Sequence, residues 1–230
     1  MRVVALIPAA GHGRRMGAEK PKAFLPLGGL PILAHTLQRF EDCPQVDEVL
    51  PLVPPGKALD WAEEIVRRSG LKKVSRIVPG GSERQESVYR GLRAIQGKAD
   101  RVLIHDGVRP FVTGALIRRV VAAAGEHGAA AVGVPVRDTV KSVSAAGVVV
   151  NTVEREGLWL TQTPQAFRRH VICSAYEKAA QDGFSGTDDA CLVERMGASV
   201  RMILGDHDNI KMTTPEDLAL GVIILRRFSS

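Results

Sequence analysis

The residues best suited to chemistry lie in one glycine-containing segment near the N-terminus. An apolar run over Val3–Ile7 leads into Pro8-Ala-Ala-Gly11, and cationic side chains follow within a few residues. Glycine lets the backbone approach a phosphate group and point its N–H groups at it. The segment therefore predicts a site that holds a triphosphate while its α-phosphorus is attacked. The cations are Arg14, Arg15, Lys20 and Lys22.

Two better-known phosphate-binding loops do not match this segment. A dinucleotide-binding GxGxxG pattern starting at Gly11 would need glycine at position 16, where Met16 stands. It would also need an acidic residue at the end of the second strand, which reads Leu52-Val-Pro-Pro55. No GxxxxGK[ST] string is present either. Two glycines alone are typical of an ordinary strand–helix turn, and the clustered cations favour the functional interpretation.

Composition and charge restrict the class of protein. The chain has 230 residues, of which 45% are hydrophobic and 24% charged, as in folded globular proteins. The net charge of +6 is compatible with nucleic acid or with small anionic substrates. Aromatic residues make up only 4%, and no lysine- and arginine-rich tract is present. We therefore expect no nucleic-acid partner.

The cysteines and the N-terminus bear on location. The three cysteines lack metal-ligand spacing, which indicates small hydrophobic side chains in a reducing compartment. The apolar run after Met1-Arg2 is too short for a signal peptide, and no stretch is long enough to span a membrane. The sequence predicts a cytoplasmic protein with no membrane partner. The cysteines are Cys43, Cys173 and Cys191.

Strands and helices alternate along the chain. This rhythm predicts a single α/β domain over residues 1–230, with a Rossmann-like, mostly parallel sheet flanked by helices on both faces. Ligands of such sheets bind beyond the carboxyl ends of the strands. Strands are predicted over Val3–Ile7, Val46–Val53, Val74–Val78, Arg101–Ile104, Ala130–Val136, Leu158–Gln162 and Val200–Leu204. Helices are predicted from Pro31, around Trp61–Val66, from a Ser82–Gln85 capping box, from Thr113, over Val171–Ala180 and Asp188–Met196, and from Thr214-Pro215.

Residues 137–156 interrupt this rhythm. Thr139–Ser144 and Val148–Val153 read as two strands joined by a short turn. A lone hairpin is marginally stable in water, so it is expected to pack on something, such as a second subunit.

The glycine-containing segment, Pro8-Ala-Ala-Gly-x-Gly-x-Arg-Met16 followed by Pro21-Lys22, resembles the nucleotide-activating loop of nucleotidyltransferases that act on sugar and polyol phosphates. Later segments resemble, in order, those of the 2-C-methyl-D-erythritol 4-phosphate cytidylyltransferases, and the resemblance extends over about residues 3 to 221. These segments are Gly80–Val88, His105–Pro110, Pro135–Lys141, Arg155–Trp159, Thr163–Gln165, Thr187-Asp188 and Asp208–Lys211.

The resemblance implies transfer of CMP from CTP to 2-C-methyl-D-erythritol 4-phosphate. The products are 4-diphosphocytidyl-2-C-methyl-D-erythritol and pyrophosphate, and Mg²⁺ or another divalent cation accompanies CTP. It implies that Arg15 and Lys22 stabilise the transition state and that Arg155 and Lys211 position the acceptor. A phosphate dianion is already nucleophilic, so no histidine needs to act as a base. His105 is interpreted as a loop or packing residue.

The same resemblance assigns binding residues. It gives no certain metal ligand, and Ser82 stands where an aspartate is frequent. Residues 137–156 correspond to an arm that crosses to the other subunit of a homodimer, so that Thr139 and Arg155 would complete the neighbouring site. The nucleotide-binding residues implied are Pro8, Ala9, Ala10, Gly11, Gly13, Gly81, Ser82 and Ser87, and those for the acceptor are Asp106, Arg109, Thr139 and Thr163.

Alternatives remain at this point. A ribitol 5-phosphate cytidylyltransferase shares the loop and differs in the acceptor site. A non-catalytic nucleotide-binding regulator is a second possibility, and the presence of Arg15, Lys22, Arg155 and Lys211 argues against it. For Asp106 and Arg109, a local ion pair is the alternative to substrate binding.

Overall fold

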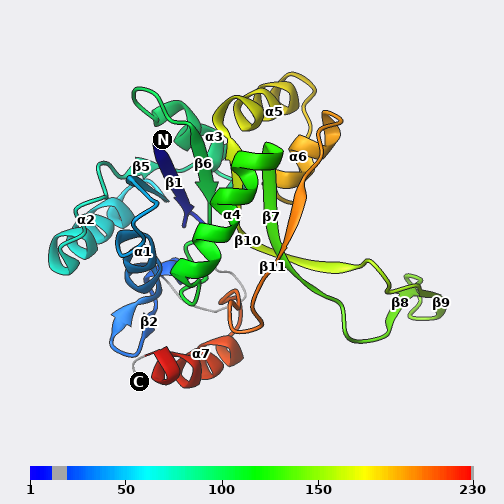
Figure 1. The fold of residues 1–230 in the computed structure, drawn as a ribbon. Coiled ribbons are helices and arrows are strands. Elements are labelled where there is room, and N and C mark those ends of the chain that lie inside the picture. Colours follow the sequence, from blue (N-terminus) through cyan, green and yellow to red (C-terminus); the bar gives the residue numbers. More distant parts are fainter. Residues whose placement is uncertain (12–19, 229–230) are drawn as a thin grey trace.

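A seven-stranded sheet forms the centre of the molecule in the computed structural model, which describes residues 1–11 and 20–228. Figure 1 shows its strands side by side, in the order β11-β7-β10-β6-β1-β4-β5. They are β1 (Val3–Pro8), β4 (Glu48–Val53), β5 (Val78–Pro79), β6 (Arg101–Ile104), β7 (Ala129–Pro135), β10 (Trp159–Arg168) and β11 (Arg201–Leu204). A small hairpin, β2 (Pro26–Leu27) and β3 (Leu30–Pro31), follows the short 3₁₀ helix η2 (Lys22–Phe24).

The sheet is mostly parallel, as predicted. Within the described seven-stranded sheet, β10 alone runs antiparallel to its neighbours, β6 and β7. It is also longer than predicted, since it continues past Gln162 through an irregular register to Arg168. The predicted strand Val74–Val78 is reduced to the edge strand β5, with Val74 making one isolated bridge to Val49. An edge strand has a hydrogen-bonding neighbour on one side only, so fewer of its residues are held in the sheet.

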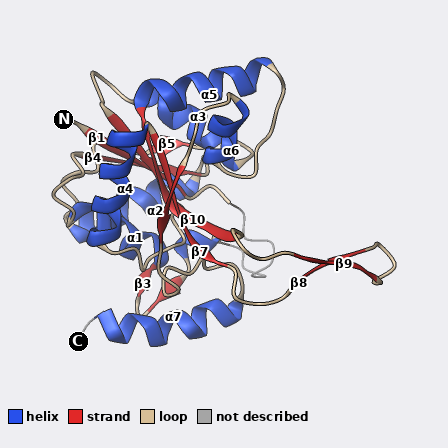
Figure 2. Ribbon diagram, turned by 45° about the vertical axis from the view of Figure 1, so that its right-hand side comes forward, coloured by secondary structure: helices blue, strands red, loops and turns tan. Residues whose placement is uncertain are grey.

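Helices cover both faces of the sheet (Figure 2). Val3, Ala5 and Ile7 of β1 pack with the helices of one face, and Val4 and Leu6 with those of the other, because successive strand residues point to opposite sides. The buried strand β1 thus has the continuous apolar sequence typical of parallel sheets. The first group is α1 (Ile32–Glu41), α2 (Lys57–Ser69), α4 (Gly114–His127) and α7 (Pro215–Phe228); the second is α3 (Arg84–Ala94), α5 (Arg169–Gln181) and α6 (Asp189–Arg195).

The start of α3 differs from the prediction. The helix begins at Arg84, and its N-cap residue, Glu83, makes no side-chain capping bond. The backbone N–H and the hydroxyl of Ser82 both bond to Glu86, at 2.7 and 2.9 Å. Gln85 instead accepts a bond from the distant Gly186 N–H at 2.9 Å. The expected capping box is therefore wrong, because both of its side chains are engaged elsewhere.

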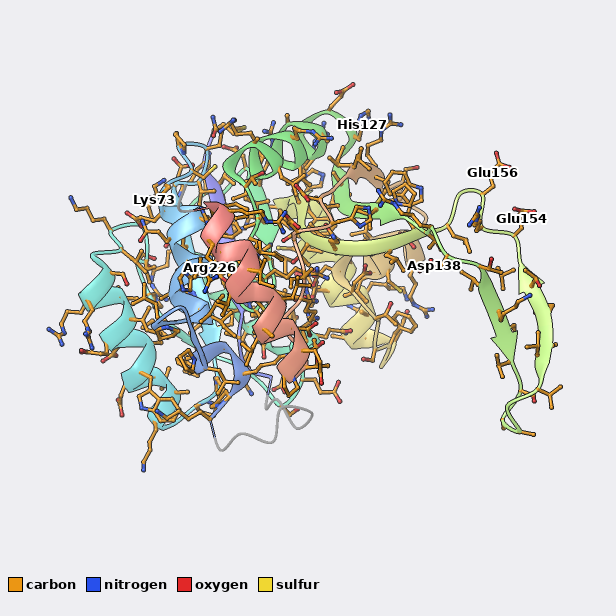
Figure 3. The ribbon with its side chains drawn as sticks, turned by 90° about the horizontal axis from the view of Figure 1, so that it is seen from below. Lys73, His127, Asp138, Glu154, Glu156 and Arg226 are labelled. Atoms are coloured by element: carbon orange, nitrogen blue, oxygen red, sulfur yellow. The ribbon has the colours of Figure 1, made fainter. Side chains whose placement is uncertain are left out.

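The predicted hairpin is present and projects from the body of the molecule (Figures 1 and 3). Its strands, β8 (Val140–Val143) and β9 (Val149–Val153), pair with each other and, within the described residues, with no other strand. Several of its apolar side chains are exposed, namely Val143, Val148, Val149 and Val150. No helix in the described part of the chain combines the length and the apolar character that crossing a membrane requires.

Candidate active site

The site lies where the chain changes direction across the sheet. From β1 the chain passes to β4 and β5 on one side, and then returns to place β6 on the other side of β1. The loops that follow β1 and β6 therefore diverge and open a crevice at their carboxyl ends. The two loops are joined at its base, where the Gly107 N–H donates to the Pro8 carbonyl at 2.9 Å.

One cavity in this crevice collects most of the residues expected to bind nucleotide. The loop after β1, the first turn of α3 and two lysines line it together, although they lie far apart in the sequence. Gly13 and Arg15, also expected here, lie outside the described residues. Gly81 is adjacent to the lining rather than part of it. The expected residues that line the cavity are Pro8, Ala9, Ala10, Gly11, Ser82, Ser87, Lys22 and Lys211.

Ser87 holds the loop beside this cavity in place through two hydrogen bonds. Its buried hydroxyl accepts the Gly81 N–H and donates to the Glu83 carbonyl, both at 2.9 Å. The neighbouring Gly80 lies so close to the β1 loop that an added Cβ would be 2.8 Å from the Ala10 Cβ. A side chain at position 80 would push the two loops apart, so glycine is required there for packing.

Lys22 reaches the cavity from η2. Its side chain passes close to the β1 loop, since a Cβ added at Gly11 would lie 3.7 Å from the Lys22 Cε. The ammonium group is thus brought to the glycine-containing backbone where a phosphate could contact both.

A second cavity adjoins the first and shares Arg84, Asp106 and Lys211 with it. It extends past Arg109 and Thr163 toward Thr187 and the start of α6, and it holds three of the residues expected to bind the acceptor. Two adjacent cavities with positive charges at their junction fit a reaction between two anionic molecules. The expected acceptor residues present are Asp106, Arg109 and Thr163.

Asp106 lies at this junction and is surrounded by positive charge. Its carboxylate accepts bonds from Arg84 Nε at 2.9 Å and Lys211 Nζ at 2.8 Å, whereas Arg109 Nε is 3.8 Å away. Burial alone would raise the pKa of Asp106, but the charges of Arg84, Lys211 and Arg109 outweigh it and hold the pKa well below the usual range. The carboxylate stays ionised, and the local Asp106–Arg109 pair is the weakest of its three contacts.

Lys211 is held in place by the residues on either side of it. Asn209 is fully buried and donates to the Thr163 carbonyl at 2.9 Å and to Gln162 at 3.1 Å. On the other side, the Met212 N–H donates to the Val108 carbonyl at 2.9 Å. The loop after β11 is therefore tied to both β10 and the β6 loop, which fixes the ammonium group at the junction of the cavities.

Arg84 was not among the residues expected to have a role. Besides Asp106, it contacts the fully buried Asp189 at 2.7 Å, and Asp189 also accepts the Tyr176 hydroxyl at 2.5 Å. Burial would lower the pKa of Arg84, but the two carboxylates raise it well above the usual value. The sequence placed Arg84 inside a recognised segment, yet an arginine that opens a helix is usually solvated. Nothing local distinguished it.

Thr139 and Arg155 lie apart from these cavities. Both are exposed at the base of the arm, where Arg155 donates to the Arg137 carbonyl. Figure 3 labels their neighbours Asp138 and Glu154 on the segments that lead away from the body. Within one chain, therefore, the structure does not bring these two residues to the other expected acceptor residues.

The described residues offer no metal cage. Within residues 1–11 and 20–228, no three His, Cys, Asp or Glu side chains lie together as metal ligands do. The Asp106 carboxylate is already occupied by cationic partners. Mg²⁺ commonly binds through substrate phosphates and water with one or two carboxylates, so here it would depend on the nucleotide for most of its ligands.

Comparison with known proteins identifies the family. The family model of 2-C-methyl-D-erythritol 4-phosphate cytidylyltransferase matches residues 3–227. The chain belongs to this family. A relative of that name from Geobacter metallireducens is 52% identical, with 98% of each chain covered. Membership makes the chain a cytidylyltransferase, and thus a nucleotidyltransferase enzyme.

Solved structures agree with the assignment. The 2-C-methyl-D-erythritol 4-phosphate cytidylyltransferase of Thermus thermophilus superposes with a TM-score of 0.80 at 37% identity, covering 98% of this chain and 100% of that one. The 4-diphosphocytidyl-2C-methyl-D-erythritol synthase of Anaerococcus prevotii gives a TM-score of 0.85 at 30% identity, with coverages of 98% and 96%. The α/β fold predicted for a cytidylyltransferase of this family is therefore confirmed.

Proposed function

We propose that this cytidylyltransferase transfers CMP from CTP to 2-C-methyl-D-erythritol 4-phosphate and releases pyrophosphate. The observation that supports it most directly is the pair of cavities that meet at Arg84, Asp106 and Lys211. The first cavity, beside the glycine-containing backbone, would take CTP. The second has a carboxylate and a hydroxyl for the polyol and cations for its phosphate.

The reaction is an in-line attack by an acceptor phosphate oxygen on the α-phosphorus of CTP. A bond forms between these atoms as the bond from the α-phosphorus to the bridging oxygen breaks, and pyrophosphate leaves with that electron pair. The protein's task is to align the two anions and to neutralise the charge that accumulates. Arg15 and Lys22 stabilise this charge at the α-phosphate, while Lys211 and Arg155 position the acceptor phosphate.

Truncation of Lys22 or Arg15 to alanine tests this assignment. Removing one preorganised charged donor lowers turnover by about 10²–10³. We expect that loss in kcat, measured by pyrophosphate release, with little change in the melting temperature. Equal kcat in the wild type and Lys22→Ala would show that this lysine does not stabilise the transition state.

Binding roles follow from the same arrangement. We infer that Pro8, Ala9, Ala10, Gly11, Gly13, Gly81, Ser82 and Ser87 form the nucleotide site, and that Asp106, Arg109, Thr139 and Thr163 bind the acceptor. A divalent cation such as Mg²⁺ would be held mainly by the phosphate oxygens of CTP and by water, and it would supply charge neutralisation beside Lys22.

We further propose a homodimer of one-domain chains in which residues 137–156 complete the neighbouring site. The exposed valines of β8 and β9 support this, because an arm with such a surface is stabilised when another chain covers it. The positions of Thr139 and Arg155 on the arm support it too. A cytoplasmic location is consistent with the free cysteines Cys43, Cys173 and Cys191.

Pyrophosphate release from CTP in the presence of individual polyol phosphates tests the function. We expect release only when an acceptor is present, and a clear preference for 2-C-methyl-D-erythritol 4-phosphate over ribitol 5-phosphate in kcat/KM. Preference for ribitol 5-phosphate would assign the alternative activity. Tight CTP binding without any turnover would indicate a regulator.

A further inference from the structure

His105, which follows β6 directly, is buried beneath the acceptor side of the site. Its ring has no solvent exposure and packs against Phe40, with ring centroids 5.0 Å apart. Both ring nitrogens have partners: Nε2 lies 2.9 Å from the Arg109 carbonyl oxygen, and Nδ1 lies 3.2 Å from the Thr163 hydroxyl. An imidazole with two such partners does more than fill space.

The partners determine where the ring carries its proton. A carbonyl oxygen can only accept, so the Arg109 contact requires a hydrogen on Nε2. Burial lowers the pKa of His105 to about 4, so the ring is neutral near pH 7 and Nδ1 carries a lone pair. The opposite tautomer would place the Nε2 lone pair against the carbonyl lone pairs.

This tautomer in turn fixes the hydroxyl of Thr163. Since His105 Nδ1 can only accept, the Thr163 O–H must donate to it. The same oxygen accepts the Asp106 N–H at 3.0 Å. The single proton of the Thr163 hydroxyl is thus donated to His105. Toward the adjoining cavity, Thr163 can therefore only accept a hydrogen bond, through a lone pair.

We propose that His105 is a positioning residue that orients the acceptor site, and that Thr163 accepts a hydrogen bond from a hydroxyl group of the polyol. One imidazole ties together the backbone of Arg109, the side chain of Thr163 and, through Thr163, the backbone of Asp106. A phosphate dianion has no hydrogen to donate, so it does not satisfy Thr163. This inference rests on the proposed acceptor activity.

The first test replaces the ring. His105→Phe keeps an aromatic ring against Phe40 and removes both hydrogen bonds. We expect the KM for the acceptor to rise at least about tenfold, as a lost pair of hydrogen bonds implies, while the KM for CTP changes less than twofold. A purely structural role would lower the melting temperature and leave the ratio of the two KM values unchanged, which would overturn the proposal.

The second test concerns the direction of the Thr163 bond. Acceptor analogues that each lack one hydroxyl are compared in the wild type, Thr163→Val and the control Thr163→Ser. One analogue should lose about five- to tenfold in kcat/KM with the wild type and with Thr163→Ser, and lose nothing further with Thr163→Val. If every analogue loses the same factor in the wild type and in Thr163→Val, Thr163 does not contact a hydroxyl.

A measurement on the unmodified protein keeps this inference separate from the proposed function. The ¹⁵N shifts of His105 should show a protonated Nε2 and an unprotonated Nδ1 at pH 7. An Nδ1–H tautomer or an imidazolium would contradict the positioning role even in an active enzyme. Failure of the wild type to use any polyol phosphate would reject the proposed function, whatever the tautomer.

Discussion

At position 84, one guanidinium group joins α3 to two carboxylates from distant parts of the chain. It is one of three cationic partners of Asp106 at the site, and it forms an ion pair with the buried Asp189 on α6. Arg84→Met should destabilise the protein by about 3 kcal/mol, because removing one member of a buried pair leaves the other charge unpaired. Urea unfolding measures this loss.

The matched comparison for Arg84→Met also removes the charge of Asp189, which that substitution leaves unpaired. Compared with Arg84→Met alone, Arg84→Met combined with Asp189→Asn should recover part of the lost stability but no activity, since Asp106 still lacks one of its three cationic partners. If the double variant is destabilised by the sum of the two single effects, the ion pair does not contribute as described.

His105 predicts a pH dependence of stability whose sign can be worked out. Its pKa is about 4 in the folded protein and near the ordinary 6.5 when unfolded, so between these values the unfolded state binds more protons. The contribution to stability is therefore full above pH 6.5 and is lost as the pH falls to about 4. It amounts to about 3 kcal/mol.

The measurement compares urea unfolding of the wild type and His105→Phe from pH 7 to pH 4. The variant lacks the titrating group, so the stability difference between the two proteins should shrink by about 3 kcal/mol as the pH falls. Parallel curves would mean that the imidazole is not kept neutral by burial.

For single residues, the sequence predicted which residue types lie at the site, but it did not predict which residues they contact. Lys22, Asp106 and Lys211 were expected at the site and line its cavities. Arg84 and His105 were not given a role, because their importance comes from contacts with residues 22 to 105 positions away. Such long-range contacts leave no local pattern in the sequence.

Among the elements, the Gly80-Gly81 loop makes a sharp prediction. Gly80→Ala introduces a Cβ that would lie 2.8 Å from Ala10 and 2.9 Å from the Ser87 hydroxyl. The β1 loop must move, so the KM for CTP should rise about tenfold and the stability should fall by about 1–3 kcal/mol, as in overpacked cores. Steady-state kinetics and thermal unfolding check both effects.

Gly114→Ala is the control for this change. An added Cβ there meets nothing closer than 3.5 Å, at the first residue of α4, where alanine favours the helix. It should leave the KM for CTP unchanged and not lower the stability. An equal effect of both substitutions on CTP would rule out a specific contact between the loops.

Those helices and strands that have a clear hydrophobic pattern could be predicted from the sequence. The continuous apolar run of β1 and the alternating strands and helices gave the layers correctly. The pattern could not show that β10 runs antiparallel, because strand direction depends on the path of the intervening arm. The predicted start of α3 was wrong, because Ser82 bonds to Glu86 and does not form the predicted capping box with Gln85.

For the whole molecule, the position of Arg155 on the arm makes it possible to test which subunit supplies this residue to a given site. If Arg155 acts in the partner's site, inactive Lys22→Ala and Arg155→Ala chains should complement each other when co-expressed with different tags. Each mixed dimer would contain one intact site. Random pairing then gives roughly a quarter of wild-type activity, because half of the dimers are mixed.

The control is a mixture of Lys22→Ala with Lys211→Ala, two changes on the body of the chain. Both residues serve the same site of their own chain, so each site in a mixed dimer keeps one defect and no activity should return. Recovery in the control, or none in the Arg155 mixture, would contradict the shared site.

The attachment of the arm has a mechanical consequence. β7 leads into it and β10 leads out, and the two remain paired up to Pro135 and Trp159 at its root. The same β10 carries Thr163 under the acceptor cavity. The inner end of the arm is therefore part of the central sheet. In the proposed homodimer, a partner that displaced the tip of the arm would act, through the paired strands β7 and β10, on residues that line the acceptor cavity of the same chain.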